Sequence, residues 1–96
     1  MKIKVINTTT DSYEIAYKIA KLLVSERLSP CVQTVPKIKS TYMWEGKLEK
    51  SDEILLVIKT IPEKVQDCKK IILKYQLDIN HKPCNFVELF PRLKEK

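Results

Sequence analysis

Five consecutive aliphatic residues, Ile54-Leu55-Leu56-Val57-Ile58, place the strongest constraint on how this chain can fold. They lie within residues 51–59, which we expect to form a strand, and successive side chains of a strand point to opposite faces of its sheet. An antiparallel sheet with one face in solvent should alternate apolar and polar residues, and this run does not. Helices can cover one face. The simplest cover for the other face is a second copy of the chain.

The rest of the chain predicts a regular order of strands and helices. Apolar residues at period two or at helical spacing, together with turn residues, indicate the boundaries. Gly46, the one glycine, lies in a turn at 45–47 where it can adopt a positive φ angle, and Pro36 interrupts the longest extended segment. The expected elements are a strand at 2–8, a helix at 12–27, an extended segment at 31–44, a strand at 51–59, a helix at 62–75 and a strand at 85–90.

This order predicts an α+β fold with the ferredoxin-like βαββαβ pattern, in which two helices cover one face of an antiparallel sheet. Because no linker or repeat divides the 96 residues, we expect a single domain over 1–96. The extended segment 31–44 is far longer than the average strand of about 5–6 residues. Its length also favours association with another copy of the chain.

Composition argues against several classes of protein. The net charge of +6 is spread along the chain without a recognised nucleic-acid motif, so we expect no nucleic-acid partner. The chain contains neither an apolar run long enough to span a membrane nor a signal-peptide pattern at its start. Three widely spaced cysteines, Cys31, Cys68 and Cys84, fit a reducing compartment better than a disulfide framework. We therefore expect a cytoplasmic protein that does not associate with membranes.

Residues 25–60, SERLSPCVQTVPKIKSTYMWEGKLEKSDEILLVIKT, resemble the CutA family of divalent-cation tolerance proteins. The shared features are a cysteine at the start of an extended segment (Cys31), a tyrosine-x-tryptophan (Tyr42, Trp44), the acid-glycine turn after it, and an aliphatic strand that ends in Lys59-Thr60. The resemblance implies a ferredoxin-like homotrimer linked to copper and other divalent ions. It also implies an architecture similar to that of the PII signalling proteins. We expect that no cofactor is required for folding.

The C-terminal part departs from the family pattern. Where the family commonly has a His-Pro-Tyr-x-x-Pro segment, this chain reads LDINHKPCNFVELFP, in which Pro83 and the strand 86–89 can be matched and the His-Pro-Tyr cannot. We also expect no closing helix after the last strand.

Three residues are candidate metal ligands: Cys31, His81 and Cys84. Thiolate is a good ligand for copper(I) or zinc, and His81 precedes Cys84 by three residues in an expected loop. Each has a simpler interpretation, because free cysteine often packs as a small hydrophobe and a structural zinc site usually has four ligands. Cys68 lies on the inner side of the expected second helix and is interpreted as core.

A second set of candidates, Tyr42, Trp44, Glu45 and Lys59, could line a cleft between subunits. The alternative is that the two aromatic residues pack in an interface while the two charges are solvated, since aromatic side chains are enriched in interfaces for their area alone.

These observations predict a trimeric CutA-like protein that binds copper or another divalent metal ion and takes part in the response to metal ions. The alternative is a PII-like trimeric signalling module whose inter-subunit clefts bind a small anionic ligand or a protein partner. We expect no enzymatic activity, because the sequence contains no phosphate loop, nucleophile elbow or metalloprotease helix.

Overall fold

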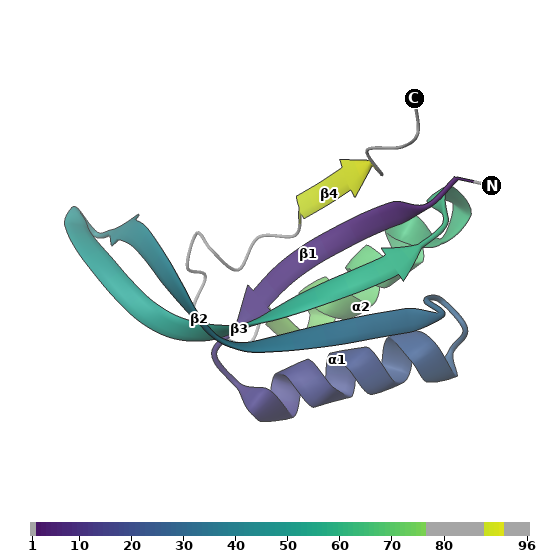
Figure 1. Ribbon diagram of the computed structural model, residues 1–96, viewed down its shortest axis with the longest axis horizontal. Coiled ribbons are helices and arrows are strands. Elements are labelled where there is room, and N and C mark those ends of the chain that lie inside the picture. The colour runs from purple at the N-terminus through teal and green to yellow at the C-terminus, as the bar shows by residue number, and fades with distance from the viewer. Residues whose placement is uncertain (1, 77–87, 92–96) are drawn as a thin grey trace.

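The computed structural model describes residues 2–76 and 88–91, with side chains described for residues 2–75. Its elements follow the expected order (Figure 1). They are β1 (Lys4–Thr10), α1 (Tyr13–Ser25), β2 (Cys31–Trp44), β3 (Lys47–Thr60), a 3-10 turn η1 (Pro62–Lys64), α2 (Val65–Gln76) and β4 (Glu88–Pro91). The α+β, ferredoxin-like fold predicted from the sequence is thereby confirmed.

The four described strands form one antiparallel sheet in the order β2-β3-β1-β4. Both helices lie on the same face of this sheet, as Figure 1 shows. Neither of these two helices has the length and apolar content needed to cross a membrane. The opposite face of the sheet is covered by no helix of the described residues.

The core lies between the helices and one side of β1 and β3. Residue alternation divides each strand: Ile6, Leu56 and Ile58 face the helices and are fully buried, whereas Val57 faces the other way and is half-buried. The buried apolar residues are Ile6, Ala16, Ile19, Leu23, Ile54, Leu56, Ile58, Val65, Cys68 and Ile72. The helices therefore cover only alternate members of the aliphatic run 54–58.

Local hydrogen bonds account for the two ends of α1. Ser12 is its N-cap, and the Ser12 Oγ accepts the Ile15 N–H at 3.2 Å. At the other end the N–H of Leu28 donates to the Leu23 carbonyl and the N–H of Arg27 to the Val24 carbonyl, which is a Schellman motif. Arg27 takes the left-handed conformation (φ 61°) that this motif requires. This tight ending directs the chain into β2.

The β2–β3 hairpin extends well beyond the helices and curves as it does so (Figure 1). Each of its strands has 14 residues, so β3 begins at Lys47 rather than at residue 51 as expected from the sequence. Polar residues at 47–53 concealed this extension, because strand pairing here follows from β2 and the turn rather than from apolar burial. The interruption expected at Pro36 is a register shift between Val35 and Ile38.

Cys68 is part of the core, as expected from its position on the inner side of α2. Its side chain is fully buried, and its Sγ donates to the Leu28 carbonyl at 3.6 Å. Burial raises the pKa of the Cys68 thiol above its ordinary value of 9.0, because the thiolate is poorly solvated there. The neutral thiol is therefore the form that packs in this core.

The hairpin turn yields the first prediction. Glu45 (φ 52°) and Gly46 (φ 79°) both have positive φ angles between the paired residues Trp44 and Lys47, as in a type I′ turn. A Cβ at Gly46 would meet nothing within 4 Å, so the cost of substitution comes from the backbone alone. Gly46→Val should lower the free energy of unfolding by more than about 1 kcal/mol, and Gly46→Asn by less, because Asn tolerates this conformation. Equal melting temperatures for Gly46→Val and the parent in calorimetry would contradict this.

The second prediction concerns alkaline pH. Because the folded-state pKa of Cys68 is raised, the folded protein holds this proton to higher pH than the unfolded chain. Its contribution to stability is therefore complete below the ordinary value of 9.0 and is lost as pH rises toward the folded pKa. Urea unfolding between pH 8 and 10.5 should show a steeper loss of stability for the parent than for Cys68→Ala, by up to about 1.4 kcal/mol per pH unit. Parallel pH profiles would mean that the thiol does not titrate differently in the two states.

Candidate functional site

The sheet face without helices, here called the open face, contains the side chains that alternate with the core residues. On β3 these include Leu55, Val57 and Lys59, and on β2 they include Cys31 and Val35. Leu55 and Val57 are half-buried and Val35 is 40% exposed in the single chain. The described part of one subunit therefore presents an incompletely covered apolar strip along its two longest strands.

Cys31 and Lys59 are cross-strand partners at one end of this open face. Cys31 is exposed within the subunit, unlike the buried Cys68. The Ser29 side chain connects the backbones of Cys31 and Lys59. Its Oγ accepts a hydrogen bond from the Cys31 N–H at 3.2 Å and donates one to the Lys59 carbonyl at 2.6 Å. The ordered backbone presents the Cys31 thiol and the Lys59 ammonium on the same face.

The other cleft candidates lie at the opposite end of the hairpin. Trp44 pairs with Lys47 at the turn, and Tyr42 pairs with Glu49; both aromatic side chains are half-buried, whereas Glu45 is exposed in the turn. Thirteen residue steps of β2 separate Cys31 from Trp44, which corresponds to about 40 Å for a straight strand. Cys31 and Lys59 therefore cannot share one site with the aromatic pair inside a single subunit.

The candidate metal ligands are only partly described. His81 and Cys84 lie outside the described residues, so their position relative to Cys31 is not given by the structure. Within residues 2–76 and 88–91, no group of three or more His, Cys, Asp or Glu side chains is close enough to hold a metal ion. Cys31 has an ammonium rather than a second ligand as its cross-strand partner. The described part of one subunit does not fit a metal ion without further ligands.

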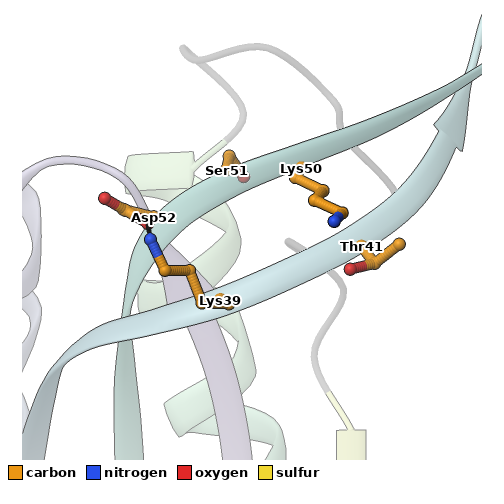
Figure 2. Close-up of a pocket in the computed structure, with 5 residues that line it drawn as sticks. All are labelled: Lys39, Thr41, Lys50, Ser51 and Asp52. Atoms are coloured by element: carbon orange, nitrogen blue, oxygen red, sulfur yellow. Dashed lines mark hydrogen bonds and ion pairs between the residues drawn. The ribbon is translucent and has the colours of Figure 1, made fainter.

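A surface depression with a volume of about 540 Å³ lies on the extended hairpin, lined by Lys39, Thr41, Lys50, Ser51 and Asp52. Figure 2 shows the Lys39 and Asp52 side chains pointing toward each other, with their Nζ and Oδ1 atoms 2.6 Å apart. Both side chains are more than half exposed, and surface pairs of this kind contribute little to stability. Lys50 adds a second ammonium, so the depression is weakly basic.

The structure also contains a buried polar cluster that the sequence analysis missed, formed by Ser40, Ser51 and Glu53 on the open-face side of the hairpin. Glu53 is 2% exposed and Ser40 is 8% exposed. The Ser40 Oγ donates to the Glu53 Oε1 at 2.6 Å. One signal was available in the sequence: strand alternation places Glu53 on the same face as Leu55 and Val57, where a charged residue is unusual.

Comparisons with known proteins agree on one family. The family model of the CutA1 divalent ion tolerance protein matches residues 4–79. The Thermus thermophilus divalent-cation tolerance protein CutA is 46% identical over 57 residues, which is 59% of this chain and 55% of that protein. Human protein CutA is 42% identical over 52 residues, 54% of this chain and 29% of that protein. The matched segment thus spans about half or less of these curated relatives.

Solved structures extend the similarity over nearly the whole chain. The Thermus thermophilus Cut A1 structure superposes with a TM-score of 0.77 at 31% identity, covering 98% of this chain and 85% of that one. The CutA structure from Xylella fastidiosa gives a TM-score of 0.78 at 31% identity, covering 95% and 82%. The family-model match, the sequence relatives and the fold all lead to one conclusion: this chain belongs to the CutA1 divalent ion tolerance protein family.

Proposed function

We propose that the chain is a single domain over residues 1–96 that assembles as a cytoplasmic homotrimer, binds copper or another divalent metal ion, and takes part in tolerance of these ions. Membership of the divalent ion tolerance family is the observation that carries this proposal. We propose a binding protein rather than an enzyme, without a nucleic-acid partner and without a metal requirement for folding.

The open face supports the homotrimer. Its half-buried and exposed aliphatic side chains lie on strands that extend beyond the subunit's own helices. Covering such surface is favourable by roughly 25 cal/mol for each Å² of apolar area removed from water. The resemblance to the CutA family supplies the number of subunits, which an uncovered face alone does not specify.

The proposed metal site uses Cys31, with His81 and Cys84 as the further ligands. The exposed Cys31 thiol is accessible to a metal ion within the subunit. Because the described residues contain no complete ligand group near it, the site requires ligands from the segment that carries His81 and Cys84, from a neighbouring subunit, or from both. A thiolate ligand would favour copper(I) or zinc over harder ions.

A second candidate function, binding of a small anionic ligand as in a PII-like module, is favoured by one feature. Lys39 and Lys50 line the depression on the hairpin, and Lys59 lies on the open face. Asp52 already pairs with Lys39, which reduces the net positive charge available to an anion. Titration of the protein with nucleotides, followed by Trp44 fluorescence, separates this candidate from metal binding.

The third prediction tests the assembly. Light scattering at micromolar concentration should give three times the chain mass of 11.2 kDa. Trp44→Ala should weaken assembly, because truncating a packed aromatic side chain costs roughly 3–5 kcal/mol. Tyr17→Ala is the matched control, since Tyr17 is 66% exposed on the outer side of α1. A monomer mass for the parent would exclude the trimer, and equal assembly of the two variants would exclude Trp44 from the interface.

The fourth prediction tests the metal ligands. Cys31→Ser or Cys84→Ser should lower copper(I) affinity by a factor of ten or more, about 1.4 kcal/mol, whereas Cys68→Ser should not. The parent's affinity should also fall as pH drops, because protons compete with the metal ion for thiolate. Affinity is measured by competition with a chelator of known strength.

Thermal unfolding of each cysteine variant is the accompanying control, because a buried serine without a partner costs about 1–3 kcal/mol. If the Cys31 and Cys84 variants bind copper as tightly as the parent, the thiolate site is wrong, and family membership would be the sole support for a metal role.

A further inference from the structure

One face of the extended hairpin changes from charged to apolar toward the turn. Three successive cross-strand pairs lie on it: Lys39 with Asp52, Thr41 with Lys50, and Met43 with Leu48. All six side chains share this face, because alternate residues of a strand point to the same side. The first two pairs line the depression described above, and the third pair is next to it in the direction of the turn.

Lys50 places an unpaired positive charge in the depression. Among the side chains described for residues 2–75, no carboxylate pairs with the Lys50 ammonium, whereas the Lys39 ammonium lies 2.6 Å from the Asp52 Oδ1. Thr41 is directly across from Lys50, as Figure 2 shows, and its hydroxyl can donate a hydrogen bond. An ammonium and a hydroxyl side by side favour an anionic group such as a carboxylate or a phosphate.

Met43 and Leu48 supply the apolar part of this face. They are 58% and 67% exposed, and as cross-strand partners they form one patch rather than two scattered residues. A ligand in the depression can remove part of this patch from water. The patch is two residue steps from the Thr41–Lys50 pair, so a ligand that contacts both must extend about 7 Å beyond its charged group.

The size and charge of the depression restrict the kind of ligand. Its volume of about 540 Å³ lies in the range of roughly 300–1,000 Å³ that is usual for small-molecule sites. A metal ion fits poorly, because Asp52 is the single carboxylate among the lining residues and the ammonium groups of Lys39 and Lys50 repel a cation. Both lysines are exposed, so the affinity for an anion should fall as salt is added.

We propose that this face of the hairpin binds a small organic anion, a carboxylate or a phosphate monoester, that carries an apolar group. Lys50 and Thr41 hold the anionic group in the depression, and Met43 and Leu48 cover the apolar group. The proposal rests on the second candidate function, binding of a small anionic ligand, and deepens it. It is independent of the proposed metal site.

The ligand class is tested with straight-chain carboxylates from acetate to octanoate, titrated into the full chain in its native assembly and followed by NMR of the backbone amides. Affinity should rise by up to about fourfold for each methylene that leaves water. The shifted amides should lie within residues 39–43 and 48–52. Octylammonium, with the same chain and the opposite charge, should bind about tenfold more weakly than octanoate or worse. Equal affinity for acetate and octanoate, or for octanoate and octylammonium, overturns the proposal.

Octyl phosphate, compared with octanoate in the same titration, distinguishes the two sources of the anionic group. Tighter binding of either one supports the proposal and identifies the preferred group.

Three charge variants locate the anionic group. Lys50→Gln should lower octanoate affinity by about three- to fivefold, the upper range for an exposed charge pair. Lys47→Gln is the matched control, because Lys47 is an exposed lysine of the same strand on the opposite face, and it should leave the affinity unchanged. Asp52→Asn should raise the affinity, because it releases the Lys39 ammonium and removes a repelling carboxylate. Equal effects of the two lysine variants, or no gain with Asp52→Asn, overturn the proposal.

The double variant Met43→Ser, Leu48→Ser locates the apolar group. It should abolish the rise in affinity with chain length and leave acetate binding unchanged. Val24→Ser, which removes an apolar side chain that is 45% exposed on α1, is the control. Light scattering on the same samples covers the competing role of the patch. Loss of assembly in the double variant with an unchanged dependence on chain length would make the patch a subunit contact and overturn the proposal.

Failure of this site and failure of anion binding in general give different results. Octanoate that shifts amides around Lys59, on the open face, instead of those of the hairpin overturns the site and leaves the second candidate function standing. If none of these anions and no nucleotide binds the protein, both are overturned.

Discussion

The apolar character of the central strand β3 on both of its faces is the constraint on which the rest of this structure depends. The helices cover Leu56 and Ile58 completely, yet Leu55 and Val57 between them are only half-buried. On folding, an isolated chain of this size buries roughly 60–65% of the surface that is exposed in the unfolded chain, so its free energy of unfolding is small. A strand that is apolar on both sides adds stability only when both sides leave water, so folding and self-association are expected to be linked.

The long hairpin follows from the same constraint. Fourteen-residue strands extend past the helices, and the type I′ turn at Glu45-Gly46 holds them in register. Val35 and Ile38 are three residues apart on β2, whereas their partners Leu55 and Glu53 are two residues apart on β3. The bulge near Pro36 accommodates the extra residue, so Val35 and Ile38 lie on the same face of the sheet. A single continuous surface therefore runs from Cys31 toward the hairpin turn.

Sequence periodicity predicted the element order, the fold class and the core position of Cys68, because each depends on local apolar spacing. It placed the start of β3 four residues late, since the polar stretch before Glu53 is ordered by pairing with β2 rather than by burial. The Ser40–Glu53 hydrogen bond was not predicted for a related reason: it joins residues 13 apart across the hairpin. The roles of Cys31, His81 and Cys84 depend on contacts between segments or subunits, which periodicity does not report.

The partly exposed aliphatic side chains of the open face supply affinity for a cover rather than specificity. Aliphatic contacts tolerate sliding, because one half-buried Leu or Val can replace another at little cost, and a register slip by two residues would keep Leu55 and Val57 on the same face. Leu55 and Val57 therefore favour association without fixing its register. The register has to be set by features outside this strip, such as the length of the two 14-residue hairpin strands.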